Sequence, residues 1–588
     1  MSKYSDEFML WLKDEGYTHC FYLSGGNVMH LLESASQNFV CIPFVHEVGA
    51  GIAADYFNEI ATGGQRAFVL VTAGPGLTNV VTAIAGAWTD SRELLVIGGQ
   101  AKVSDLSRGK YRQIGFQEID GRTLCESITK ASVTIDSQIS RNELHYYCEL
   151  SRTGRKGPVF LEFCIDISAS VYDPSRSEDS KIDLPQVLSA PVSDIGPLRK
   201  LIEKSNRPII LIGGGVPRSY DLSELRRLGI PMATTFNGSD RVGIDYEFYC
   251  GRPNWYGSRW ANMIIQQADL VIAVGTRLGL LQVGYNTNEF APKAKIVHVD
   301  IDSSELNKGF PRVDLPIQSD SVMFLDVLRD IFSTQSAIDW SDWKELIKSI
   351  REFWAKPDKS NSARPEYLEF HSFLFRLFND ASSSDIISPC SSGGTYTGVL
   401  QLLLNKDQQR IVTSHALAGM GYGLPGAIGM AFAHPSRRVL ALEGDGGFAQ
   451  NLQELGVVKA HKLNLKMFIS SNRGYASIRS SQRAYFNGHY VGCDESSGLG
   501  FPDWSMIFKS YDIPVIEVSH ENAFGPEFTD LLNSEGPAAF VLRLDPEQSY
   551  FPRIGSRLNA KGEMESAPLH QMTPELSVQE SQKFLPYL

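Results

Sequence analysis

The sequence predicts an α/β protein made of three doubly wound parallel-sheet domains. Apolar runs of strand length, such as residues 67–71, 208–212 and 439–443, alternate along the chain with segments of helical apolar period. Several of these runs end at glycine-rich turns. Strands that alternate with helices form parallel sheets covered by helices. A chain of 588 residues is too long for one hydrophobic core, so it should divide into several domains.

The composition is ordinary for a soluble protein, with 43% hydrophobic and 21% charged residues. A net charge of −12 argues against nucleic acid or an anionic membrane as a partner. No apolar run approaches the roughly 20 residues that span a bilayer. The amphipathic N-terminus carries acids, unlike a signal peptide. The eight cysteines form no CxxC pair, so reduced thiols and a cytoplasmic location are expected.

Changes in composition predict the domain boundaries. A stretch rich in Ser, Asp and Pro follows residue 170, and a charged, Trp-rich helical stretch ends in polar residues between about 335 and 365. Beyond residue 545 the chain is Pro-rich and irregular. The expected division is into domains at 1–170, 190–335 and 366–545, with a C-terminal tail at 546–588.

In the first domain, Glu47 lies where an apolar strand gives way to a helix. Pro43, Phe44 and Val45 precede it, and small apolar residues follow it. Desolvation in such surroundings would raise the pKa of the carboxyl group and keep its proton in place. A helix-start acid stabilised by the helix dipole is the other explanation, and the local residues alone favour it.

In the third domain, residues 439–478 form a predicted strand–helix–strand unit. The first strand ends at Gly444, and the second runs from Leu465 to Ile469. Both strands should finish at the same sheet edge, so Asp445 and Asn472 can face each other. A carboxylate, an amide oxygen and a loop carbonyl provide half of an octahedral shell for Mg²⁺. The glycines would let main-chain N–H groups approach a diphosphate, although a generic doubly wound enzyme with a Gly-rich turn is the alternative.

These motifs resemble those of a known family. GDG followed by a distant asparagine is similar to the thiamine-diphosphate signature, with Ser471 where a first asparagine is usual. HEVGAGIAADYF, TAGPGLTNVVTAIAGAWTDS and GFQEID resemble, in order and spacing, the pyrimidine-binding domain of the acetolactate synthase family. The resemblance implies a pyrimidine-binding domain, a central Rossmann-like domain and a diphosphate-binding domain.

The resemblance assigns roles to the matched residues. Glu47 would donate a hydrogen bond to the cofactor's pyrimidine ring and favour the tautomer that removes the thiazolium proton. Asp445, Asn472 and the main chain of Gly474 would hold Mg²⁺. Met420 would force the cofactor into a bent shape, although the residue by itself favours an ordinary core methionine. The other implied contacts come from Gly25 and Gln117 in the catalytic pocket and, around the cofactor, from Pro75, Gln100, Ala418, Gly444, Gly446, Gly447 and Tyr475.

The central domain leaves FAD binding open. The triple glycine at 213–215, with Asp300 and Asp302, matches the family's FAD pattern. The family's two aspartates and second arginine are replaced by Gly279, Leu280 and Leu281. A lysine near the cofactor is likewise replaced, by Ile165.

The implied reaction is decarboxylation of a 2-oxo acid, dependent on thiamine diphosphate and magnesium, with transfer of the acyl carbanion to a carbonyl acceptor. Leu281 and Ile165 remove cations that would bind an acceptor carboxylate, which favours a neutral aldehyde or keto-sugar. Arginines elsewhere, for example Arg252, could replace them. A simple 2-oxo acid decarboxylase without carboligation and a non-catalytic regulatory relative are the alternatives. A homodimer or homotetramer with active sites between subunits is expected.

Overall fold

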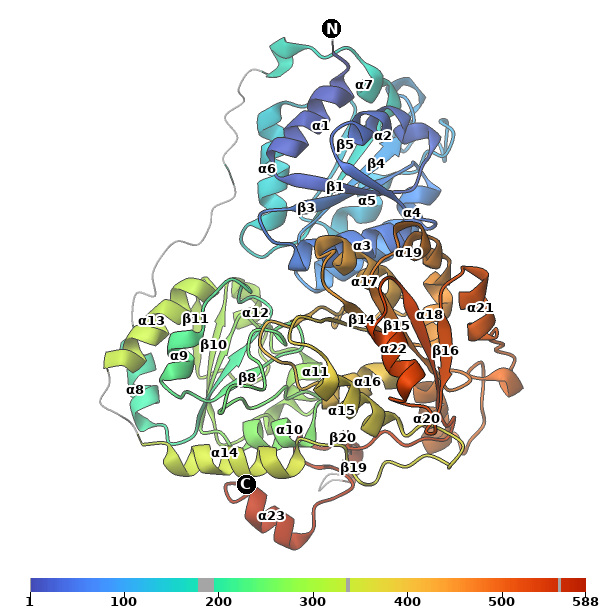
Figure 1. The fold of residues 1–588 in the computed structure, drawn as a ribbon. Coiled ribbons are helices and arrows are strands. Elements are labelled where there is room, and N and C mark those ends of the chain that lie inside the picture. The colour runs from blue at the N-terminus through green and yellow to red at the C-terminus, as the bar shows by residue number, and fades with distance from the viewer. Residues whose placement is uncertain (1, 178–183, 185–194, 335–338, 559–561) are drawn as a thin grey trace.

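The computed structural model describes residues 2–177, 184, 195–334, 339–558 and 562–588. Three parallel sheets of six, five and six strands succeed one another along the chain, which confirms the predicted fold class. In Figure 1 the first sheet lies at the top, the second at the lower left and the third at the lower right. The first predicted linker falls mostly on residues outside the described ones. None of the described helices is both long and apolar enough to cross a membrane.

The N-terminal domain contains a sheet in the order β2-β1-β3-β4-β6-β5. Its central strands are buried on both faces, as expected where helices cover a parallel sheet. Its strands are β1 (Tyr17–Tyr22), β2 (Val40–Pro43), β3 (Arg66–Val71), β4 (Leu94–Gln100), β5 (Ala131–Ile135) and β6 (Pro158–Cys164). Its helices are α1 (Tyr4–Asp14), α2 (Met29–Ser36), α3 (Glu47–Ile60), α4 (Pro75–Thr89), α5 (Gly121–Cys125), α6 (Arg141–Arg152) and α7 (Ile165–Ala169).

The central domain contains a sheet in the order β11-β10-β9-β7-β8. Its strands are β7 (Pro208–Ile212), β8 (Met232–Thr234), β9 (Leu270–Val274), β10 (Lys295–Asp300) and β11 (Leu315–Gln318). Its helices are α8 (Gly196–Lys204), α9 (Ser223–Arg227), α10 (Arg259–Gln266), α11 (Leu280–Val283), α12 (Ser303–Leu306), α13 (Ser321–Thr334) and α14 (Ser341–Trp354). The Trp-rich stretch forms α14, and Trp343, Ile347 and Ile350 complete the hydrophobic core of this sheet.

The C-terminal domain contains a sheet in the order β13-β12-β14-β15-β17-β16. Its strands are β12 (Ile386–Pro389), β13 (Arg410–Ile411), β14 (Val439–Gly444), β15 (Leu465–Ser471), β16 (Val515–Val518) and β17 (Ala538–Arg543). Its helices are α15 (Phe370–Asp380), α16 (Gly393–Leu402), α17 (Gly423–Ala433), α18 (Asp445–Asn451), α19 (Leu455–His461), α20 (Ala476–Tyr485), α21 (Trp504–Ser510) and α22 (Pro526–Asn533).

Two local features differ from the sequence-based expectation. The single helix expected after Gly444 is divided into α18, a 3₁₀ turn at Leu452–Glu454, and α19. The division occurs at Asn451, whose φ of −133° leaves the helical region and whose side chain donates to the carbonyl of Gly421 at 2.7 Å. The tail, expected to be irregular, packs on the central domain with helix α23 (Val578–Phe584) and four short strands: β18 (Arg553–Ile554), β19 (Ser556–Leu558), β20 (Met564–Ser566) and β21 (Met572–Thr573).

The N-terminal and C-terminal domains share one hydrophobic core, formed mainly where α3 packs on α17. A buried ion pair lies beside this interface. The guanidinium of Arg92 donates to Asp55 at 3.1 Å and to the carbonyl oxygen of Thr413 at 2.6 Å. Both charged side chains are at least nine-tenths buried. Arg92 therefore joins the two domains by a charge-assisted hydrogen bond.

We expect Arg92→Met to destabilise the protein by about 3–5 kcal/mol, because the Asp55 carboxylate is left buried without a partner. The double variant Arg92→Met/Asp55→Leu should recover most of this loss, since neither charge of the pair remains. The measurement is the first unfolding transition in guanidinium chloride. Arg141→Met, which breaks the exposed pair with Asp14, is the control and should cost less than about 1 kcal/mol. An effect of Arg92→Met no larger than the control would contradict this account.

Candidate functional site

The turn after β14 places Asp445 at the first residue of α18, where it is 2% exposed. Its carboxylate accepts three main-chain hydrogen bonds: from Gly446 at 2.8 Å, from Asn472 at 3.0 Å and from Gly474 at 3.3 Å. The turns after β14 and β15 therefore meet, as the strand–helix–strand unit predicted. Burial raises the pKa of Asp445 to about 6, while the N–H groups act in the opposite direction.

One amide atom of the Asn472 side chain has no hydrogen-bond partner. Its amino group donates to the Tyr550 hydroxyl at 3.4 Å, whereas its Oδ1 atom is buried and has no hydrogen-bond partner. A buried acceptor without a partner is costly. A hard cation between this oxygen and the Asp445 carboxylate would satisfy it and neutralise the buried charge. The residues present therefore fit Mg²⁺.

The glycines of the turn allow close packing around the site. A Cβ atom on Gly446 would lie 2.2 Å from the ring of Tyr475, so only glycine fits there. Gly447 lies against Glu443, a residue that sequence reasoning missed. Burial raises the pKa of Glu443 to about 8. A charged residue within the apolar run 439–444 was the signal that could have identified it.

The segment between β13 and α17 carries Ala418 and Met420. Ala418 has a φ of +53°, a left-handed conformation that is unfavourable for a residue with a Cβ atom. Met420 is 40% exposed, and the neighbouring Leu417 is 36% exposed. Met420 is thus not an ordinary core methionine, because its side chain reaches solvent in the segment between β13 and α17.

Glu47 is the first residue of α3 and is 5% exposed. Its carboxyl accepts a hydrogen bond from the Asn79 side chain at 3.0 Å. Gly76, in the first turn of α4, lies beside it, and Pro75 is the first residue of the same helix. The strand-to-helix junction predicted for Glu47 is present, between β2 and α3.

The remaining N-terminal candidates lie at the same edge of the sheet. Gly25 precedes a 3₁₀ turn that leads into α2, and Gln117 has a left-handed φ of +61°. Gln100 ends β4, and its amide group is fully engaged by Ala101, Ile119 and Glu162. Its contact with a cofactor stays a prediction, like the roles of the other candidates.

Glu454 is a second acid that sequence reasoning missed. It lies in the 3₁₀ turn after α18, is completely buried, and contacts the main chain just before Glu47. The two residues whose main chain it contacts are more than 400 residues away in the sequence, so no local pattern indicates the contact.

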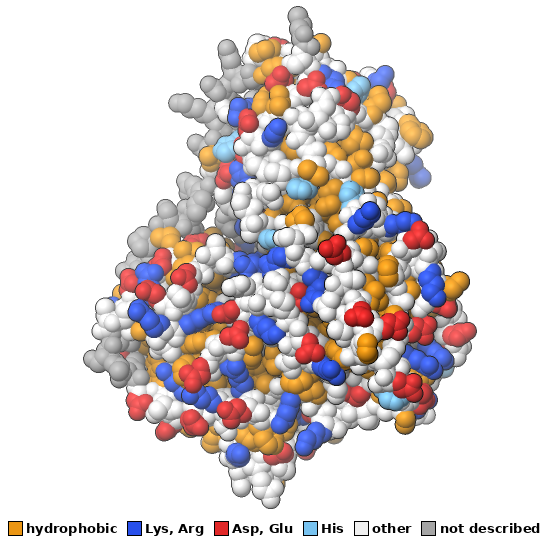
Figure 2. Space-filling model, in the orientation of Figure 1, with side chains coloured by type: hydrophobic (Ala, Val, Ile, Leu, Met, Phe, Trp, Pro, Cys, Tyr) orange, Lys and Arg blue, Asp and Glu red, His pale blue; other side chains and the backbone are white. Residues whose placement is uncertain are grey.

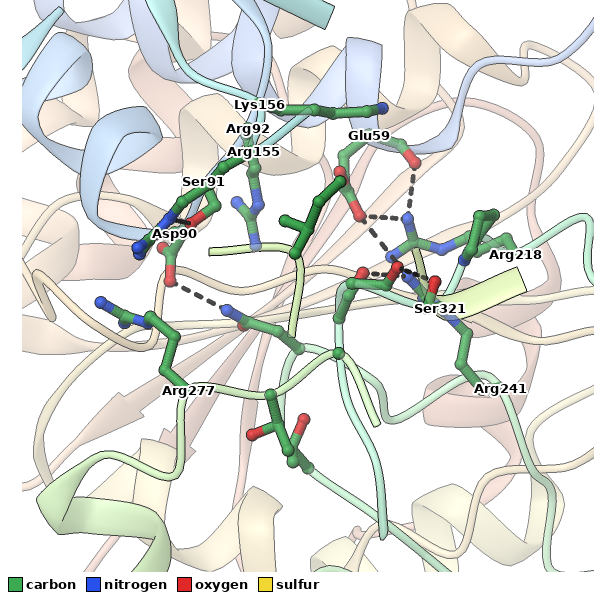
Figure 3. A pocket seen from close by; sticks show the side chains of 18 of the residues that line it. Glu59, Asp90, Ser91, Arg92, Arg155, Lys156, Arg218, Arg241, Arg277 and Ser321 are labelled. Carbon is green, nitrogen blue, oxygen red and sulfur yellow. Dashed lines mark hydrogen bonds and ion pairs between the residues drawn. The ribbon is translucent and has the colours of Figure 1, made fainter. Parts of the chain in front are cut away.

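A cavity of about 1170 Å³ lies where the three domains meet (Figure 3). Gly214, Gly215 and Asp300, which matched the FAD pattern, line it. Two of its arginines are paired with acids: Arg218 with Glu59 and Asp240, and Arg155 with Asp302 and Glu305. On the face in Figure 2, basic and acidic side chains are mixed over the central and C-terminal domains.

Comparison with known proteins identifies all three domains. Models of the thiamine pyrophosphate enzymes match residues 2–124 (N-terminal TPP binding domain), 195–328 (central domain) and 392–542 (C-terminal TPP binding domain). The chain is 27% identical to acetolactate synthase isozyme 2 large subunit of Escherichia coli, covering 92% of this chain and 96% of the relative. It is 28% identical to acetolactate synthase large subunit of Lactococcus lactis, with 93% and 94% covered. It is 29% identical to the probable acetolactate synthase large subunit of Methanocaldococcus jannaschii, with 92% and 91% covered.

Asp445→Ala should weaken the binding of Mg²⁺ and of diphosphate together, each by at least about tenfold, because one ion would bridge protein and phosphate. Calorimetric titration of each ligand in the presence of the other measures this. Asp503→Ala, which removes the acid capping α21 in the same domain, is the matched control and should bind both ligands normally. Diphosphate binding that is unchanged in Asp445→Ala would exclude the assignment.

Proposed function

Because the chain belongs to the acetolactate synthase-like family of thiamine pyrophosphate enzymes, we propose that it decarboxylates a 2-oxo acid and transfers the acyl unit to a carbonyl acceptor. The observation that carries this proposal is the meeting of Asp445 and Asn472 at the joint edge of β14 and β15: the Asn472 main-chain N–H donates to Asp445, while the Asn472 amide oxygen is buried without a partner. Thiamine diphosphate, when bound, supplies the carbon that adds to the substrate carbonyl and accepts the electrons left by CO₂.

The protein's own residues hold the cofactor and control one proton. Asp445, Asn472 and the main chain of Gly474 would bind Mg²⁺ and, through it, the diphosphate. Glu47, buried beside Asn79, would hold a proton toward the pyrimidine ring nitrogen. Met420, exposed beside the strained Ala418, would press against the cofactor and fix its bend. Gly25, Pro75, Gln100, Gln117 and Tyr475 complete the proposed pocket.

A neutral acceptor is favoured by the residues of the central domain. Leu280 and Leu281 begin α11 and line the cavity between the domains, where the family has charged residues. An acceptor carboxylate would lack its cation at this position. An aldehyde or a keto-sugar therefore suits the chain better than a second 2-oxo acid.

The proposal requires no flavin. The cavity at the junction has room for a large ligand, but Gly279 and Leu280 replace the acids that the family uses there. Asp302, one of the two aspartates that match the FAD pattern, already forms an ion pair with Arg155 at 2.7 Å. A flavin bound in this cavity would take no electrons in the proposed reaction.

We also propose that the working unit is a dimer or an assembly of dimers. Apolar side chains are exposed at the edge that carries Glu47, namely Met29, Val45, Ile114 and Phe116. Others are exposed at the edge that carries Asp445, namely Leu417, Met420, Ile478, Tyr485 and Phe486. Exposed apolar groups gathered at functional edges are typical of surfaces that another chain covers. A second copy of this chain would place one edge over the other and enclose the cofactor between them.

The purified protein with thiamine diphosphate and Mg²⁺ should release CO₂ from a 2-oxo acid, and mass spectrometry should find the acyl unit joined to an added aldehyde. Glu47→Gln should lower both signals by at least about a hundredfold while the fold is retained. Glu126→Gln, which changes an exposed acid of the same domain, is the control. Release of CO₂ with no joined product from any acceptor would indicate a simple decarboxylase. Equal activity of Glu47→Gln would refute the role of Glu47.

Mixing two inactive variants tests the assembly. Glu47→Gln and Asp445→Ala chains, reassembled together, should regain about one quarter of the wild-type sites, because half of the dimers contain both chains and each of these has one intact site. The activity of the mixture and native mass spectrometry of the mixed dimers provide the measurement. Mixed dimers without activity would mean that both residues act within one chain.

A further inference from the structure

We propose that Glu454 is a positioning residue for Glu47: its carboxylate fixes the main chain from which the Glu47 side chain projects. Glu454 belongs to the C-terminal domain, whereas Glu47 begins a helix of the N-terminal domain. The inference rests on the proposed function, because Glu47 matters only if it handles the cofactor's proton.

Each oxygen of Glu454 accepts one main-chain hydrogen bond from the two residues before Glu47. Oε2 accepts from the Val45 N–H at 3.1 Å, and Oε1 accepts from the His46 N–H at 2.9 Å. These N–H groups lie just ahead of α3, where the helix itself offers them no acceptor. The carboxylate therefore fixes the direction in which the chain enters the helix, and with it the position of Glu47.

The first turn of α3 lies directly on the Glu454 side chain. A Cβ atom on Gly49 would come within 2.9 Å of Oε1, so glycine allows the contact to be this close. The break after Asn451 brings Glu454 to this position, because a continuous helix from Asp445 would carry the side chain elsewhere. The break in the expected helix therefore allows Glu454 to contact the main chain of Val45 and His46.

The charges favour the same role. Burial raises the pKa of Glu454 to about 7, and the neighbouring Glu47 acts in the same direction. The two N–H groups stabilise a negative charge on Glu454. The two carboxyl groups are therefore close enough for the charge on one to act on the other.

Glu454 also joins two parts of the proposed machinery. The segment that begins at the metal residue Asp445 ends at the contact with Val45 and His46. A shift of α18 would therefore be passed to the helix that carries Glu47.

The test compares Glu454→Gln with Glu369→Gln. Glu369 caps α15 in the same domain and also accepts one main-chain N–H on each oxygen, from His371 and Ser372, but it has no contact with α3. In Glu454→Gln, the NH₂ group of the new side chain faces one of the two main-chain N–H groups of Val45 and His46. Two donors then meet, and that hydrogen bond is lost. In the protein without cofactor, amide hydrogen exchange at Val45 and His46 should therefore rise at least about tenfold in Glu454→Gln and stay unchanged in Glu369→Gln.

With saturating thiamine diphosphate and Mg²⁺, exchange of the cofactor's C2 proton should slow by about 10–100-fold in Glu454→Gln. Cofactor affinity should change by less than about threefold, because the diphosphate contacts remain. A purely structural role would instead lower affinity and stability together. If Glu454→Gln does not fold, Gly49→Ala, which keeps the acid and crowds its contact, should give a smaller change in the same direction.

Normal C2 exchange in Glu454→Gln, while Glu47→Gln loses it, overturns the inference and leaves the proposed function intact. The same holds if amide exchange at Val45 and His46 is faster in Glu454→Gln while C2 exchange stays normal, because the contact would then not affect Glu47. A wild-type protein whose C2 exchange is no faster than that of free cofactor would refute the proposed function instead. The amide exchange of the protein without cofactor still reports on the Glu454 contact in that case.

Discussion

The close packing of α3 against α17 is the constraint on which the rest of the site depends. A Cβ atom on Gly429 would lie 2.0 Å from the carbonyl oxygen of Ala53, so the two helices touch through their backbones. One helix begins with Glu47, and the other follows the segment that carries Met420. Packed interiors do not deform gradually, so this contact fixes the distance between the two segments of one chain, which the proposed dimer places in different active sites. The Arg92–Asp55 pair and Glu454 reinforce the same interface at its sides.

The sequence predicted the fold class and the meeting of Asp445 with Asn472 for one physical reason. Parallel strands end at a common edge, so residues directly after two adjacent strands are neighbours wherever they lie in the chain. The position of Glu47 at a strand-to-helix junction followed from a local change of period. The roles of these residues came from family resemblance and stay proposals.

What the sequence could not predict depends on contacts between distant segments. Nothing near Glu454 indicates that its partners are Val45 and His46, and nothing in the tail indicates that Tyr550 reaches Asn472. The break in the helix after Asp445 depends on Asn451 reaching Gly421 in another segment. Helix α23 was missed for a different reason: Ser577 and Glu580 form a capping box that local reading could have found, but proline-rich surroundings obscured it.

The unpaired amide oxygen of Asn472 has a consequence for the stability of the protein without its ligands, and so for the rate at which the protein is degraded. A binding site with an unsatisfied acceptor beside a buried carboxyl is less stable empty than filled. Ligand that binds only the folded chain raises its stability with the logarithm of the free ligand concentration. Chains made when the vitamin is scarce would spend more time unfolded and be removed faster by proteases. Turnover of this protein would then follow the supply of thiamine without any dedicated sensor.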